Sequence, residues 1–187
     1  MAGQLRIIAG KWARRKLQLS AAVDAGVTRP TGDRVREALF SALGSEITDA
    51  RVLDLFAGSG ALGIEALSRG AEFAMFCEQD HRCAEQLVTN LKKLDAGDCA
   101  QMQSVDALGW LKRYQGVSFD VVFLDPPYHL NLSEEFWENL IKIVVPNGLI
   151  VLEREKKSTI DCPAGFEVVW DRLYRKTRLL WLRKDAE

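Results

Sequence analysis

The feature that most constrains the fold is the alternation of strand and helix patterns between residues 51 and 153. Short apolar runs bounded by turn residues predict five strands, at 52–56, 73–77, 99–103, 120–124 and 149–153. Segments with helical spacing follow the first four strands, at 61–69, after Asp80, after Asp106 and from Ser133 to Val145. Such alternation predicts a parallel sheet with right-handed crossovers and helices on both faces.

The two ends of the chain complete this outline. Residues 166–170 and 174–182 predict an antiparallel pair at the edge of the sheet. We therefore expect an α/β protein with a doubly wound, mostly parallel, seven-stranded sheet. Residues 5–19 predict a small β-hairpin and a linker follows it, so the chain is expected to divide into a basic N-terminal extension, 1–30, and a main domain, 31–187.

Charge is unevenly distributed although the net charge is only −1. Residues 1–40 carry eight Lys/Arg against three Asp/Glu, and residues 154–187 carry nine against six, whereas the body between them carries eight against seventeen. Each basic end is as consistent with a solvated face as with a function. The two ends could also converge in space to form a phosphate-binding surface.

Targeting and metal signals are weak in this sequence. No apolar run approaches the roughly 20 residues of a membrane span, and the N-terminal residues lack the apolar core of a signal peptide. The four cysteines form no C-x-x-C pair, and the two histidines are not spaced like metal ligands. We therefore expect a cytoplasmic, monomeric protein with free thiols, no metal and no membrane association.

A glycine-rich loop follows the first predicted strand, in the stretch LDLFAGSGALG at 53–63. Ligands of open parallel sheets bind beyond the carboxyl ends of the strands, and glycines let the backbone approach them closely. The glycines at 58, 60 and 63 also match a dinucleotide fingerprint, so an NAD-dependent oxidoreductase is one reading. A lone match of this type is weak.

Three acids at successive strand ends favour a different ligand. Asp54 lies inside the first strand, where it would meet the ammonium or sulfonium of S-adenosylmethionine, and NAD has no amino acid end to satisfy it. Glu78 ends the second strand and can bind ribose hydroxyls, and Asp106 follows the third and can accept from an adenine amino group. Singly each acid could be a cap, but together they indicate a nucleoside-binding site.

The fourth strand ends abruptly in Asp125-Pro126-Pro127-Tyr128. With this tetrapeptide, the glycine loop and Glu78, the chain resembles the class I S-adenosylmethionine-dependent methyltransferases that modify exocyclic amines. RIIAGKW near the start and RPTGDRVREALF at 29–40 resemble segments of the bacterial 16S rRNA guanine-N2 methyltransferase family, the RsmD family. The resemblance covers nearly the whole chain and implies a Rossmann-like fold.

The resemblance also implies roles for individual residues. The cofactor's methionine part would lie on Asp54, Ala57, Gly58, Ser59 and Gly60, its ribose on Glu78 and its adenine on Asp106. The catalytic residues would be Asp125, Pro126, Pro127 and Tyr128, with Arg29-Pro30-Thr31 near the active site. In the family we expect a Tyr-Gly-x-Thr-like stretch near the C-terminus, and this chain departs from it with Tyr174-Arg175-Lys176-Thr177.

The chemistry of amine methylation gives the tetrapeptide a physical meaning. The exocyclic amine of a base is a poor nucleophile because its lone pair is delocalised into the ring. The Asp125 carboxylate and the Pro126 carbonyl can accept from the two N–H groups and localise that pair, while the prolines hold the carbonyl rigid. Tyr128 can stack on the base, and transfer is then in-line attack on the methyl group, helped mainly by positioning.

The substrate follows partly from size and partly from the resemblance. A basic hairpin carrying Lys11, Arg14 and Arg15, with Arg29 beyond it, is too small to read DNA sequence but could hold RNA phosphates. Trp12, between these cations, is a candidate for base contact. The resemblance alone implies guanine N2 in 16S rRNA of the small ribosomal subunit. A DNA adenine or cytosine amino-methyltransferase, the NAD-dependent enzyme and a non-catalytic RNA-binding module remain alternatives.

Overall fold

The protein is described by a computed structural model that covers residues 5–20, 32–127, 129–158, 161–174 and 177–186. Seven strands form one sheet in the order β3-β2-β1-β4-β5-β7-β6. Their bounds are β1 Arg51–Asp54, β2 Phe73–Glu78, β3 Ala100–Ser104, β4 Phe119–Leu124, β5 Val144–Glu155, β6 Phe166–Tyr174 and β7 Thr177–Lys184. Strand order reverses between β1 and β4, which is where ligands of doubly wound sheets bind.

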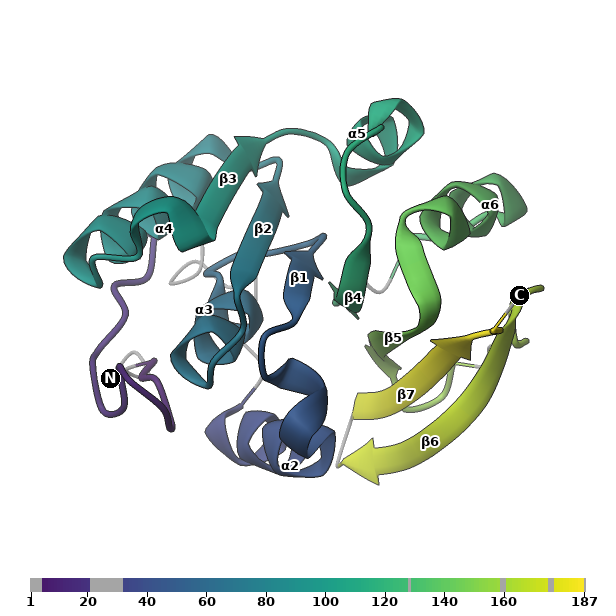
Figure 1. Cartoon of the computed structure of the whole chain (residues 1–187), viewed down its shortest axis with the longest axis horizontal. Coiled ribbons are helices and arrows are strands. Elements are labelled where there is room, and N and C mark those ends of the chain that lie inside the picture. The colour runs from purple at the N-terminus through teal and green to yellow at the C-terminus, as the bar shows by residue number, and fades with distance from the viewer. Residues whose placement is uncertain (1–4, 21–31, 128, 159–160, 175–176, 187) are drawn as a thin grey trace.

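Helices cover both faces of this sheet (Figure 1). The α-helices are α2 Asp33–Leu43, α3 Ala61–Ser68, α4 His81–Lys93, α5 Ala107–Arg113 and α6 Glu134–Lys142, with short 3₁₀ turns at Gly44–Ile47 and Gly97–Cys99. One core cluster joins α2, α3 and α4 to the sheet, and a second joins α5 and α6 to its other face. The predicted doubly wound, mostly parallel fold is confirmed, since β1 to β5 pair in parallel and β6 and β7 are antiparallel.

Pairing between strands moves several predicted boundaries. The helix expected to end at Val145 stops at Lys142, and β5 begins at Val144, because Val144 already pairs with Phe119 of β4. The turn expected at residues 146–148 is instead an irregular part of β5. The β4–β5 register shifts between Phe119 and Val121, and the backbone of Asn147 has φ +60°. The antiparallel pair is also longer than expected.

The N-terminal hairpin is shorter than predicted but firmly docked. One β-bridge joins Arg6 to Lys16, and backbone bonds from Ile7 to Arg15 (2.9 Å) and from Leu17 to Leu5 (3.0 Å) hold the two arms together. The apolar side chains of these arms belong to the core cluster on the α2–α4 face. Trp12 is only 7% exposed there, so its side chain packs in the core and the expected contact with an RNA base is wrong.

A buried carboxylate anchors the hairpin to α3. The backbone N–H groups of Ile8 and Ala9 donate to Glu65 at 2.8 and 3.0 Å, and Arg69 Nε donates to it at 2.7 Å. Glu65 is 1% exposed, so this charge depends on its cation and its hydrogen bonds for compensation. The hairpin therefore lies beside α3 and α4, while β6 and β7 form the far edge of the sheet, and the two basic ends do not converge (Figure 1).

The search for membrane and metal features covers the same residues. No helix among them is both long and apolar enough to cross a bilayer. Nor do these ranges hold a group of three or more His, Cys, Asp or Glu side chains arranged to bind a metal ion. The linker predicted before α2 lies outside the described residues.

Candidate active site

The loop between β1 and α3 is shaped by its glycines. Gly58 and Gly60 have positive φ angles, +52° and +75°, which side-chain-bearing residues rarely adopt. A Cβ on Gly60 would lie 2.3 Å from Leu87 Cδ1 of α4, so this loop packs against the helix backbone to backbone. A Cβ on Gly58 would meet nothing within 4 Å, so open space borders the loop there.

Asp54 lies beneath this loop at the end of β1. It is 2% exposed, and its Oδ2 accepts the Gly63 N–H at 3.0 Å. Burial raises the pKa of Asp54 to about 7, with a smaller contribution from the nearby Glu78, although the bond from Gly63 opposes the shift. A carboxyl group in this state gains most from a neighbouring cation, since a cation favours its ionised form.

Glu78 and Asp106 lie at the carboxyl ends of the next two strands. Glu78 receives the N–H groups of Gly58 and Asp80, both at 2.7 Å, and so fixes the glycine loop to the end of β2. Asp106 caps α5 and accepts the Gly109 N–H at 2.7 Å. A carboxylate has about four lone-pair sites, so each of these acids can accept further hydrogen bonds from a ligand.

Asp125 follows β4, the strand beside β1. Asp54 pairs with Phe123, so Asp125 stands two residues further along, on the same face of the sheet. Burial, then Glu153, then Asp54 raise the pKa of Asp125 well above its ordinary value. Pro126 is buried and Pro127 is exposed, and the Pro127 carbonyl accepts the Leu130 N–H at 2.8 Å to form a turn.

The structure therefore brings most of the predicted site together at one edge of the sheet. The loop at residues 57–60 and the acids at 54, 78, 106 and 125 all lie at the carboxyl ends of β1 to β4. Tyr128 and Arg29 lie outside the described residues. Sequence reasoning missed Glu153, which is 8% exposed near the end of β5. An acid inside the apolar run LIVLERE was the signal that could have found it.

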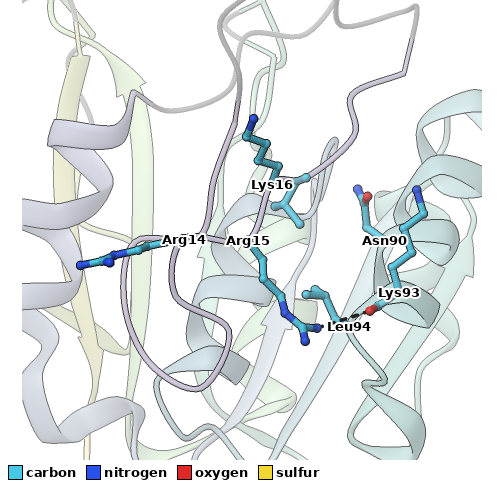
Figure 2. Close-up of a pocket in the computed structure, with 7 residues that line it drawn as sticks. Arg14, Arg15, Lys16, Asn90, Lys93 and Leu94 are labelled. Carbon is cyan, nitrogen blue, oxygen red and sulfur yellow. Dashed lines mark hydrogen bonds between the residues drawn. The ribbon is translucent and has the colours of Figure 1, made fainter.

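The basic hairpin lines a separate cavity of about 440 Å³ (Figure 2). Its lining residues are Arg14, Arg15, Lys16, Leu17, Asn90, Lys93 and Leu94. Arg15 Nη1 donates to the Lys93 carbonyl at the end of α4, at 3.4 Å. Lys11 lies outside this lining, with its Nζ 4.2 Å from the centroid of the Trp12 ring. The cavity is at the C-terminal end of α4, whereas Glu78 precedes the N-terminal end of that helix.

The chain connects these two regions along α4. Asn90 receives the Gln18 N–H at 3.0 Å and donates to the Gln18 carbonyl at 2.9 Å. Ser20 Oγ then lies 3.1 Å from the sulfur of Cys83, one turn into α4. The segment from the hairpin thus runs toward the carboxyl edge of the sheet, where the acids gather, before it leaves the described residues.

Comparison with known proteins gives a consistent picture. A family model described as "Conserved hypothetical protein 95" matches residues 5–183. "Ribosomal RNA small subunit methyltransferase D" of Haemophilus influenzae is 43% identical over 179 residues, which make up 94% of this chain and 89% of that protein. The protein of the same name from Escherichia coli strain K12 is 44% identical over 151 residues, 81% of this chain and 72% of that one.

A solved structure extends the similarity to the fold. The "Putative methyltransferase yhhF from Escherichia coli" superposes with a TM-score of 0.87 at 37% sequence identity. The superposition covers 99% of this chain and 100% of that one, so the docked hairpin and the antiparallel edge are shared along with the parallel sheet.

Proposed function

Because this chain belongs to the RsmD family of ribosomal RNA methyltransferases, we propose that it transfers a methyl group from S-adenosylmethionine to the exocyclic N2 amine of a guanine in 16S rRNA. Its activity as an rRNA methyltransferase follows from the family. One observation supports the finer proposal: the glycine loop after β1 and the Asp-Pro-Pro-Tyr end of β4 lie on adjacent, in-register strands. A methyl donor on the loop would therefore face an amine held at Asp125.

The residues around the loop fit S-adenosylmethionine. The space beside Gly58 admits the methionine part of the molecule, and Asp54 offers a buried carboxylate to its ammonium group. Glu78 would bind the ribose hydroxyls, and Asp106 the adenine amine. The bound cofactor would supply a methyl group activated by its sulfonium. S-adenosylhomocysteine would be the product, and no metal is required.

The end of β4 would hold the target base. Asp125 and the carbonyl of Pro126 would accept from the two N–H groups of the amine, and Tyr128 would stack on the ring. Two successive prolines restrict the backbone around that carbonyl, so its direction is set before the base arrives. Positioning of this kind can replace much of the entropic cost of bringing two reactants together.

The basic cavity would hold a more distant part of the RNA. The 13 residues of α4 separate it from the cofactor edge by ~20 Å, taking 1.5 Å per helical residue. Arg14, Arg15 and Lys93 would there neutralise phosphates, with Lys11 and Arg29 as further contacts. A structured substrate such as the small ribosomal subunit, or its assembly intermediate, can span that distance. We expect the enzyme to act as a cytoplasmic monomer.

The test is methyl transfer with labelled S-adenosylmethionine to small ribosomal subunits, naked 16S rRNA and duplex DNA. We expect label in subunits or rRNA and N2-methylguanosine as the modified nucleoside in mass spectra. Label in duplex DNA, or in an adenine or cytosine derivative, would overturn the guanine assignment. A thermal-shift comparison separates the oxidoreductase reading: S-adenosylhomocysteine should raise the melting temperature and NAD should not.

A further inference from the structure

Glu153 stands beside the proposed catalytic acid on the neighbouring strand. Leu124 of β4 pairs with Leu152 of β5 in parallel register, so the next residues, Asp125 and Glu153, form the following row. Neighbouring strands are about 4.8 Å apart. Since Phe123 pairs with both Asp54 and Val151, this row lies two residues beyond Asp54, toward the carboxyl edge.

The side chains of these acids project from the same face of the sheet. Val121 and Phe123 of β4 belong to the core cluster on the α2–α4 face, and Val122 and Leu124 belong to the opposite cluster. Alternation along the strand therefore directs Asp125 to the α2–α4 face. Leu149 and Val151 direct Glu153 to that face in the same way. Two carboxyl groups in one row, largely removed from water, cannot both ionise freely.

Thr177 fixes the position of Glu153. Its Oγ1 donates to Glu153 Oε1 at 3.4 Å from β7. Leu179 is the register partner of Glu153, and Thr177 is two residues before it, so both face the same side. Thr177 ends the 174–177 stretch, in which the chain departs from the expected family pattern. Glu153 and Thr177 thus give this stretch a connection to the active site.

We propose that Glu153, oriented by Thr177, is a positioning residue that acts through Asp125, the two carboxyl groups sharing one proton. The inference rests on the proposed function. With one proton on the pair, Asp125 becomes a stronger base than an isolated carboxylate, and its affinity for protons approaches that needed at neutral pH.

The proton has a defined path in the reaction. The lone pair of the guanine N2 attacks the methyl carbon, a C–N bond forms, and the C–S bond breaks with its electron pair staying on sulfur. The nitrogen then carries one positive charge and loses a proton to the Asp125 carboxylate. The pair later releases that proton to water, so the charge balance is restored without any further reactant.

The groups that face Asp125 all point to the same effect. Burial is the largest cause of its raised pKa, followed by Glu153 on β5 and Asp54 on β1. The cations next along the strands are engaged elsewhere: Arg154 Nη1 donates to the Leu130 carbonyl, and Arg178 pairs with Asp171 at 2.7 Å. Within the described residues, like charges therefore dominate the electrostatics of this row.

The experiment compares Glu153→Gln with the wild type in single-turnover methyl transfer to small ribosomal subunits across pH. We expect the variant to transfer about 10-fold more slowly at neutral pH, a fraction of the 10²–10⁴ that proton transfer typically contributes. The acid limb of its pH profile should move to lower pH, because Asp125 loses its charged neighbour. Affinity for S-adenosylhomocysteine should stay within about twofold, since Glu153 is not placed in the cofactor site.

A second readout does not need activity. An acid whose pKa is raised by folding destabilises the folded state as pH rises above the usual carboxyl range. The melting temperature of the wild type should therefore fall with rising pH more steeply than that of Glu153→Gln. Thr177→Val should shift both readouts in the same direction by less, and Thr177→Ser, which keeps the hydroxyl, should match the wild type.

The outcomes separate the two proposals. Absence of methyl transfer by the wild type would refute the proposed function, and the melting curves would still test the carboxyl pair. Transfer by the wild type, with an acid limb and a melting profile that Glu153→Gln leaves unchanged, would refute the pair alone. If Glu153→Gln does not fold, the Thr177→Val and Thr177→Ser comparison decides, and identical profiles for those two variants would overturn the inference.

Discussion

Gly10, in the hairpin segment RIIAGKW, provides the sharpest test of how the hairpin docks. It has φ +83°, and a Cβ at this position would lie 1.7 Å from the carbonyl oxygen of Ser68 on α3. Both atoms belong to backbone, so Gly10→Ala has to move the hairpin away from the helix. That movement breaks the Lys11 N–H bond to the Ser68 carbonyl at 2.7 Å and the Trp12 N–H bond to Ser68 Oγ at 3.0 Å.

The magnitude can be worked from these contacts. A non-glycine residue at positive φ costs about 1–2 kcal/mol. Two lost hydrogen bonds add about 0.5–1.5 kcal/mol each. We therefore expect Gly10→Ala to lower the free energy of unfolding by about 2–5 kcal/mol in urea titrations. Gly97→Ala is the matched control, since Gly97 has φ +54° and open space around the added Cβ, and it should cost only the first term. Equal losses in the two variants would refute the docking argument.

Three further perturbations test the site. Asp125→Ala should abolish methyl transfer while S-adenosylhomocysteine affinity stays within a few-fold by calorimetry, and a large loss of affinity would place the residue in the cofactor site instead. Arg14→Ala with Arg15→Ala should weaken RNA binding and flatten its dependence on salt, whereas Arg172→Ala on β6 should change neither; unchanged binding in the double variant would remove the hairpin from the RNA interface. Because burial raises the pKa of Asp54 to about 7, this carboxyl destabilises the fold increasingly as pH rises toward that value and fully above it, so Asp54→Asn should raise the melting temperature most above pH 7 and weaken cofactor binding; a variant that melts below the wild type there would contradict this sign.

Local patterns in the sequence were sufficient to predict the sheet and most of the site edge. The apolar runs around 52–56 and 120–124 become β1 and β4 because both are buried on two faces, where periodicity and length are informative. The glycine loop and the acids after each strand were predictable for the same reason. Carboxyl ends of parallel strands meet at one edge, so sequence position alone places them near each other.

Features that depend on pairing between distant segments were not predictable. The start of β5 is set by the pairing of Val144 with Phe119, which no local pattern contains. Trp12 lies between cations and was expected to face RNA, but burial of its large apolar ring against the core outweighs its charged neighbours. The importance of Glu153 depends on the register between β4 and β5, and an isolated strand does not reveal its neighbour.

The buried acids of this protein fall into two kinds, which differ in the charge of their partners. Glu65 is 1% exposed and lies 2.7 Å from Arg69, so its cost of burial is offset within the fold, and it holds the hairpin in place. Asp54 is equally buried, but its described partners are one backbone N–H group and another acid, and Asp125 faces Glu153 and Asp54. A fold that only needed stability would gain by replacing these residues with apolar ones. Their presence at the strand ends is best explained by a ligand that brings positive charge to them, as the ammonium and sulfonium of the proposed methyl donor would.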